Sequence, residues 1–290
     1  MKHFLLIFFL LLLVGCNKND INENNGTLNH ANLGFELAEP TIILNELANG
    51  ELKNYINSIL LVMYGNTERK WEFEYIGNTD IISKMTFYSP HYQFCEKNEF
   101  EFSYNSQNLI DKIISTRKNV CNDYKVIYIY TFNYNQKGLL KSIFMDNQSF
   151  IEENYFGYYP NGKIKEIYNS FRNRGDNITF GLQKFKYDSL FKNVTQIEHT
   201  YGSSYNYIYK YSYDSNINPF KGIFVAVSVF MPFIGPAYLS ENNVTSENIK
   251  LGNIDSGLGI TREFQFNYST NTNLLNYKFL DNERVFKINQ

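Results

Sequence analysis

Five tyrosines at every second position are the clearest candidate binding residues of this chain. They are Tyr205, Tyr207, Tyr209, Tyr211 and Tyr213. Alternate residues of a β-strand point to the same face, so these five rings are expected to share one face. Rings in this arrangement can stack on sugar rings or hold another amphipathic ligand, while their hydroxyls make hydrogen bonds. The alternative is a cross-strand aromatic stack that only stabilises the sheet.

Patterns typical of catalysis or of metal binding are scarce. Beyond the N-terminal segment, histidine occurs only as His30, His91 and His199, and the sequence has no HExxH, CxxC, G-x-S-x-G or Walker-type pattern. Asp and Glu are scattered over predicted turns and strand edges. They leave a glycosidase-like pair of carboxylates open, but the sequence selects no pair. We expect no metal, no cofactor and no enzymatic activity.

Two of the three cysteines form a candidate disulfide. If Tyr104 and Leu109 flank a hairpin turn, Cys95 lies opposite roughly Arg117 or Lys118, and Cys121 is only a few residues further along. An oxidising compartment would then favour a Cys95–Cys121 bond. The alternative is two unpaired, packed thiols.

The first sixteen residues have the pattern of a secreted lipoprotein. Met1, Lys2 and His3 form a basic head, and the apolar run over residues 4–14 ends in Leu-Val-Gly-Cys, which resembles the bacterial lipobox. The run is too short for a spanning helix, which needs roughly 20 apolar residues. We predict that residues 1–15 are a signal peptide and that the Cys16 thiol carries a lipid that anchors the chain to a membrane.

The residues after the anchor predict a tether and one folded domain. Residues 16–33 contain the lipidated cysteine and a polar, Asn-rich stretch without apolar periodicity, and residues 34–290 form a single β-repeat domain. Lys18, Asp20 and Glu23 resemble the charged export signal of Bacteroidota surface lipoproteins. The expected location is the outer membrane, with display at the cell surface as the more specific hypothesis.

Composition limits the possible partners. The chain has 290 residues with a formal net charge of −2, and 43% of the residues are hydrophobic. A near-neutral balance gives no electrostatic argument for a nucleic-acid partner, and we expect none.

An internal repeat organises the domain. The segments 132–143 and 156–167 align without gaps, and looser copies lie around Tyr75, Tyr104, Tyr187, Tyr213 and Tyr268, with a half copy at residues 49–52. Each unit is a run of alternating aromatic and polar residues, then a polar turn with Gly or Asn, then an apolar pair three residues apart. The alternation predicts a half-buried strand. The turn requires a residue that tolerates positive φ, and the three-residue step predicts a β-bulge.

The repeats predict an all-β fold. About seven or eight degenerate hairpins form an antiparallel meander of roughly 14–16 strands, which an open sheet rarely accommodates without curling. We expect a large curled or barrel-like sheet, with at most one short helix within residues 224–249.

The repeat pattern resembles that of YD-repeat proteins, with Tyr-Asp retained at Tyr187-Asp188 and Tyr213-Asp214. Together with the lipobox and the late segment 213–220, it is similar to an uncharacterised family of Bacteroidota lipoproteins described as having a porin-like fold. The resemblance covers roughly residues 50–290 and implies fold and location, but no catalytic residue. A ladder of tyrosines across the bilayer centre would be unusual, because tyrosine favours membrane interfaces. A body held at the surface by its lipid is therefore favoured over a pore.

Two further segments carry predictions. Asp188-Ser189-Leu190 resembles the Bacteroidota O-glycosylation motif and lies at a predicted hairpin tip, so Ser189 is a candidate glycosylation site. The apolar segment 224–236 interrupts the repeat. It is expected to plug or cap the end of the curled sheet, and the alternative is a docking surface.

The expected function is binding. The chain would be a lipid-anchored envelope protein of unknown ligand. A glycan is the candidate ligand, and an outer-membrane transporter is a candidate partner. The alternative is a structural or protein-interaction lipoprotein with no small-molecule ligand.

Overall fold

The computed structural model of the chain describes residues 40–45, 56–63, 66–88, 96–119, 124–147, 149–173, 179–201, 205–218, 221, 239–251, 260–268, 274–279 and 285–289. These residues contain sixteen strands and no helix. The strands are β1 (Ser58–Met63), β2 (Asn66–Tyr75), β3 (Ile82–Tyr88), β4 (Glu96–Tyr104), β5 (Ile110–Asn119), β6 (Tyr124–Tyr134), β7 (Leu140–Asp146), β8 (Phe150–Tyr158), β9 (Ile164–Asn173), β10 (Thr179–Tyr187), β11 (Val194–Tyr201), β12 (Tyr205–Ile217), β13 (Asn242–Leu251), β14 (Ile260–Tyr268), β15 (Leu274–Phe279) and β16 (Val285–Asn289).

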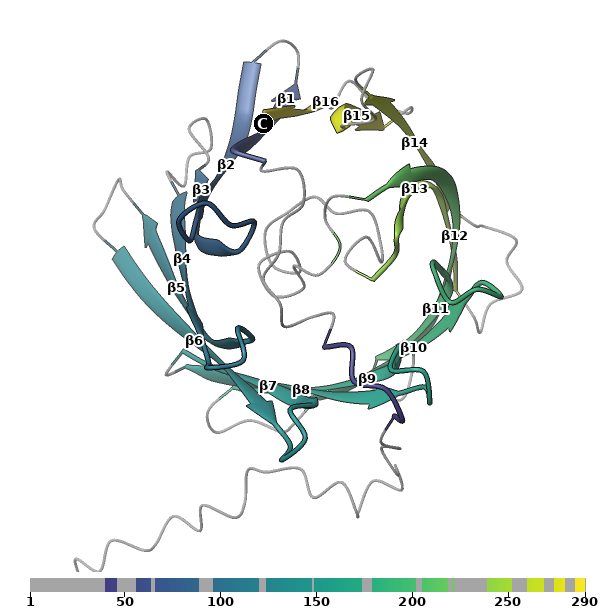
Figure 1. Cartoon of the computed structure of the whole chain (residues 1–290). Helices are drawn as coiled ribbons and strands as arrows, with labels where there is room; N and C mark the ends of the chain where they lie inside the picture. The colour runs from purple at the N-terminus through teal and green to yellow at the C-terminus, as the bar shows by residue number, and fades with distance from the viewer. Residues whose placement is uncertain are drawn as a thin grey trace, which may run out of the picture. The chain divides into compact units, whose positions relative to one another are not determined.

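The strands form one antiparallel meander that closes on itself. Each strand pairs with its neighbours in the sequence, and β1 pairs with β16, with Ser58 opposite Asn289 (Figure 1). This confirms the predicted all-β meander and its barrel-like form. The described part of the segment expected to hold a helix, residues 239–249, is instead a turn followed by strand β13.

Six hairpins end in the same way, as the repeat predicts. In each of them the tyrosine at the end of the first strand pairs with an aliphatic residue at the start of the second, and the register shifts beside that tyrosine. The pairs are Tyr75–Ile82, Tyr104–Ile110, Tyr134–Leu140, Tyr158–Ile164, Tyr187–Val194 and Tyr268–Leu274. Tyr213 and Val244 form a similar pair with a register shift, but β12 continues past Tyr213 to Ile217. The register shift is the predicted bulge. It places an extra residue on one strand, so two aliphatic residues three apart, such as Ile110 and Ile113, are both buried.

The polar turns also match the repeat. Asn108, Gly138 and Gly162 occupy equivalent positions and have φ values of 58°, 80° and 85°. Each donates its backbone N–H to the carbonyl three residues earlier. Asn135 adds a second layer, because its side-chain oxygen accepts from the N–H groups of Lys137 at 2.9 Å and Leu139 at 3.0 Å. We call the end of the barrel that carries these turns the tip end.

The repeat tyrosines connect successive hairpins. The hydroxyl of Tyr104 donates to the carbonyl of Ile82 at 2.5 Å, that of Tyr134 to Ile110 at 2.5 Å, and that of Tyr158 to Leu140 at 2.6 Å. Tyr213 donates in the same way to the carbonyl of Val194. Each acceptor is the first residue of the second strand in the preceding hairpin. The aromatic position of the repeat therefore links one hairpin to the one before it.

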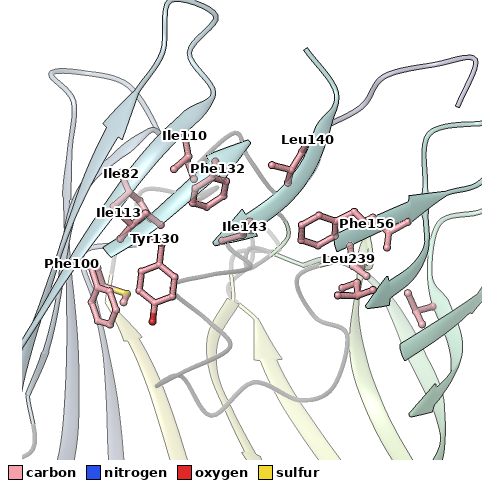
Figure 2. Packing of buried hydrophobic residues seen from close by; sticks show 14 of the residues in the cluster. Ile82, Phe100, Ile110, Ile113, Tyr130, Phe132, Leu140, Ile143, Phe156 and Leu239 are labelled. Atoms are coloured by element: carbon pink, nitrogen blue, oxygen red, sulfur yellow. The ribbon is translucent and has the colours of Figure 1, made fainter. Parts of the chain in front are cut away.

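The buried apolar side chains lie on the inner face of the barrel. They form one cluster that includes Trp71, Phe100 and Phe156, and Figure 2 shows its members directed inward from several strands. Leu239, which precedes β13, is fully buried and belongs to the same cluster, in which Figure 2 labels it. Residues in register with a buried one share its face, so the strand register assigns the other inward positions.

The outer face of β2 to β5 carries charge. Glu99 lies between three lysines, with Lys118 at 2.7 Å, Lys97 at 3.1 Å and Lys84 at 3.5 Å. A transmembrane barrel would present an apolar band here, so this part of the outer face has the opposite pattern. Among the described residues there is no helix long and apolar enough to span a membrane.

A short strap, residues 40–45, lies across two turns at the tip end. Thr41 donates its backbone N–H to the carbonyl of Pro160 at 2.9 Å. Asn45 donates to the carbonyl of Gly138 at 2.5 Å and accepts from the N–H of Leu140 at 3.0 Å. The strap therefore uses backbone groups of the β6–β7 and β8–β9 hairpins, which lie far from it in the sequence.

Candidate binding site on the inner wall

The tyrosine ladder lies in β12, and its described side chains face the barrel interior. Tyr209 is in register with Ile197 on β11 and Ile249 on β13, and Ile197 belongs to the inner core. Tyr207, Tyr211 and Tyr213 line the same wall. The side chain of Tyr205 lies outside the described residues.

The two ladder tyrosines nearest the tip end have structural roles. Tyr213 donates to the carbonyl of Val194 and accepts from the Ser240 hydroxyl at 3.1 Å, and its burial raises the pKa of its hydroxyl. Tyr211 is buried and hydrogen-bonds the carboxylate of Glu247. The tyrosines of the ladder are therefore not uniformly exposed to solvent, and these two hydroxyls already have protein partners.

Tyr207 and Tyr209 are the members that suit a ligand. Both are half-buried although they face inward, and their ring centroids are 6.3 Å apart with a tilt of 38°. Partial burial, followed by the charge of Glu247, raises the pKa of Tyr209. As in any tyrosine, its hydroxyl is protonated at neutral pH and can donate a hydrogen bond.

A row of hydrogen-bonding side chains continues from Tyr207 along the inner wall. His199 on β11 is in register with Tyr207, and Gln183 on β10 is in register with His199. All three are half-buried. Burial lowers the pKa of His199, which favours a neutral imidazole that can donate and accept.

A second polar group lies on β8 and β9. Glu152 accepts from the amides of Asn154 and Asn169, each at 2.9 Å, and Asn169 also donates to the oxygen of Asn154 at 3.0 Å. In the next strand, Gly181 is in register with Asn169. Because glycine has no side chain, β10 contributes none at this register position.

An ion pair on β13 and β14 lies on the other side of the ladder. Arg262 approaches the carboxylate of Glu247 at 3.0 Å, and the Glu247 side chain is 6% exposed whereas that of Arg262 is 46% exposed. Burial raises the pKa of Glu247, and Arg262 opposes that shift. The guanidinium thus keeps donors on a partly wet surface of the wall.

Polar side chains line much of the interior. Strands β4 and β5 contribute Asn98, Ser115 and Arg117, and β8 to β14 place amides, an imidazole, carboxylates, a guanidinium and tyrosine rings on the inner wall. Planar hydrogen-bonding groups beside aromatic rings suit a hydroxyl-rich ligand with an apolar face, such as a sugar. We call the residues Glu152, Asn154, Asn169, Gln183, His199, Tyr207, Tyr209, Glu247 and Arg262 the polar wall.

The structure corrects the register expected for the cysteines. Arg117 pairs with Asn98 and Lys118 with Lys97, so the expectation that Cys95 lies opposite Arg117 or Lys118 is wrong. Tyr104 pairs with Ile110 and not with Leu109, and the adjacent bulge shifts the register further. Cys95 and Cys121 lie outside the described residues, and their disulfide stays a prediction.

Of the other predicted sites, only Ser189 lies within the described residues. Ser189 is exposed in the turn at residues 188–193, where the carboxylate of Asp188 accepts from the N–H of Lys192 at 2.8 Å; its glycosylation stays a prediction. Cys16 and the plug segment 224–236 lie outside the described residues. Within the described part of the chain, no group of three or more His, Cys, Asp or Glu is placed to hold a metal ion.

No protein-family model matches the chain, and no curated protein matches it either. Two porin-like proteins are among the solved structures that resemble the chain weakly. A porin-like protein from Bacteroides vulgatus aligns with a TM-score of 0.39 and 9% identity, over 81% of this chain and 97% of that one. A porin-like protein from Bacteroides uniformis aligns with a TM-score of 0.35 and 9% identity, over the same shares, 81% and 97%.

Sequence reasoning found the tyrosines but missed the rest of the polar wall. Gln183, His199 and Glu247 each come from a different strand and carry no local motif. The available signal was alternation: each residue shares strand parity with a core residue, as Gln183 does with Phe185. Applying that test to every strand would have found them.

Proposed function

We propose that this chain is a non-catalytic binding protein of the cell envelope whose polar wall takes a glycan. The observation that supports the proposal is the partial burial of Tyr207 and Tyr209, which face inward beside the amide and imidazole side chains of Gln183 and His199. Tyrosine rings would stack on the apolar face of a sugar ring, and the neighbouring groups would hydrogen-bond its hydroxyls.

A binding role without catalysis fits the carboxylates of the wall. Glu247 is paired with Arg262, and Glu152 accepts from two amides, so both carboxylates are held by neighbouring side chains. These contacts orient a hydrogen-bonding surface. We propose no reaction at this site.

The location in the proposal comes from the sequence. A lipid on Cys16 would hold the barrel at the outer membrane. The more specific proposal is that the barrel is displayed on the cell surface beside a transporter. The charged outer face around Glu99 supports a body held at the membrane surface. A mass measurement on the native protein, compared with that of Cys16→Ser, tests the lipid directly.

One observation favours the second candidate, a structural or protein-interaction lipoprotein without a small ligand. Ile127 and Ile129 on β6 are each 42% exposed on the outer face, in register with Thr116 and Ile114 on β5. Adjacent exposed isoleucines suit contact with another protein.

A glycan screen of the chain without its predicted signal peptide and lipidated cysteine, residues 17–290, tests the first candidate. We expect at least one specific glycan to bind the unaltered chain, and binding to be lost in Tyr207→Ala. Tyr88→Ala is the matched control, because Tyr88 is an exposed tyrosine at the end of β3 whose register partners, Lys70 and Lys97, face outward.

The screen separates the two candidates. A hit that Tyr207→Ala removes and Tyr88→Ala retains supports glycan capture. A blank screen from a well-folded chain, or a hit that Tyr207→Ala leaves unchanged, contradicts it. The interaction role would then be tested by cross-linking on intact cells.

A further inference from the structure

The tip end of the barrel carries exposed aliphatic side chains. Leu190, in the β10–β11 turn, is 72% exposed, Ile76 in the β2–β3 turn is 45% exposed, and Ile42 on the strap is 54% exposed. Ile43 and Leu44 on the strap and Ile217 at the end of β12 are exposed as well. They come from separate segments, but all lie at the same end of the barrel, because alternate turns of a meander share one end.

Cationic side chains accompany these aliphatic ones. Lys137, in the β6–β7 turn, and Lys192, in the same turn as Leu190, are both exposed. Exposed aliphatic residues next to lysines are typical of surfaces that rest on a lipid bilayer, where the apolar groups enter the boundary of the acyl chains and the lysines meet phosphates.

The path of the chain brings the predicted anchor to this end. The described chain begins at Pro40, and the strap it starts is fixed to the tip-end turns by Thr41 and Asn45. Residues 17–39 connect Cys16 to the strap in the sequence. A lipid on Cys16 would therefore tether the barrel through its tip end.

We infer that the tip end of the barrel docks on the membrane, with Leu190, Ile76 and the strap residues Ile42, Ile43 and Leu44 in contact with lipid. The inference rests on the proposed lipid anchor at Cys16. It adds an orientation to the proposed function, because the opposite end of the barrel then points away from the membrane. That end carries Tyr124, which is 63% exposed at the start of β6.

The fluorescence of introduced tryptophans tests this orientation. The sole native tryptophan, Trp71, is fully buried and gives a constant background. Leu190→Trp and Ile43→Trp place a reporter on a turn and on the strap, and Tyr124→Trp is the matched control at the opposite end. Each mature chain carries a hexahistidine tag before residue 17 and is held on phosphatidylethanolamine–phosphatidylglycerol vesicles by a nickel-chelating lipid. Tethering therefore does not depend on whether Cys16 is lipidated.

Brominated acyl chains quench an indole that touches them. We expect both tip-end reporters to lose roughly half of their emission on brominated vesicles relative to unbrominated ones, because docked side chains lie at the acyl boundary. We expect Tyr124→Trp to be unchanged. Tip-end reporters that are unquenched, or a stronger quench at Tyr124→Trp, would overturn the docking. A mass measurement that finds no lipid on the native protein would contradict only the proposed anchor. A failure of the anchor is therefore distinguishable from a failure of the docking.

Discussion

The tyrosine of each repeat joins neighbouring hairpins through its hydroxyl. A substitution by phenylalanine removes the hydroxyl and keeps the ring, so it tests this hydrogen bond alone. In Tyr134→Phe the ring remains but the hydrogen bond to the Ile110 carbonyl is lost. We expect a loss of about 1–2 kcal/mol in the free energy of unfolding, measured by urea denaturation. Tyr88→Phe, at an exposed tyrosine, is expected to change stability by less than ~0.5 kcal/mol. Equal effects of the two substitutions would argue against the linking role.

Asn98 on β4 is the most unusual buried residue that the structure describes. It is fully buried, in register with Phe87 and Arg117, and neither atom of its amide has a hydrogen-bond partner among the described residues. An unpaired buried amide is unfavourable, so Asn98→Leu is expected to stabilise the barrel by roughly 1–2 kcal/mol.

Asn105→Leu provides the contrast to Asn98→Leu. The side chain of Asn105 accepts from the N–H groups of Gln107 and Leu109, so we expect that substitution to destabilise. Urea denaturation of both variants gives the comparison. Destabilisation by Asn98→Leu would show that its amide has an essential partner.

At the scale of elements, the turns of the tip end were predictable because their geometry is local. Asn or Gly at the positive-φ position, the tyrosine before the turn and the three-residue aliphatic step all lie within about twelve residues of sequence. The bulge at Tyr134 and Leu140 follows from that short pattern. The strap contact was not predictable, because Asn45 meets backbone groups of Gly138 and Leu140, nearly a hundred positions away.

Substitutions at two glycines distinguish the backbone strain of a turn from the contact that a turn makes with the strap. Gly77 has φ +53° and nothing within 4 Å of an added Cβ, whereas at Gly162, with φ +85°, a Cβ would lie 2.5 Å from the Ile42 carbonyl oxygen. We expect Gly77→Ala to cost about 1–2 kcal/mol from backbone strain alone. Gly162→Ala should cost more and free the strap, which limited proteolysis near residue 42 would detect. Equal losses of stability with an uncut strap would contradict this contact.

The outer-face charge cluster makes stability depend on pH. Hydrogen bonds from Lys118 and then Lys97 lower the pKa of Glu99 from 4.5 to about 2. A carboxylate with a depressed folded-state pKa stabilises above its unfolded pKa, and that contribution is lost as pH falls from about 4.5 through about 2. Glu99→Gln should therefore flatten the fall of unfolding free energy over this window, as measured by urea denaturation at several pH values. A profile as steep as that of the unaltered chain would refute this role.

At the scale of the whole molecule, the closed barrel turns its apolar core residues inward and places the polar wall among them on β8 to β14. The repeat predicted the hairpins and the barrel-like curvature. It did not predict the polar wall, because Gln183, His199 and Tyr207 meet only if three strands have the right register. A slip of one residue reverses every side chain on a strand, and each bulge adds such a slip. The same shift made the expected position of Cys95 wrong.

The most direct test of the account is a calorimetric titration of the best glycan from the screen into two matched variants. Gln183→Leu alters the polar wall on β10, whereas Gln196→Leu alters the outward-facing glutamine that donates to Glu198 on β11. The account predicts that Gln183→Leu raises Kd roughly tenfold, the equivalent of about 1.4 kcal/mol, and that Gln196→Leu leaves Kd within about twofold. A Kd raised by Gln196→Leu and unchanged in Gln183→Leu would place the ligand on the outer face and contradict the account.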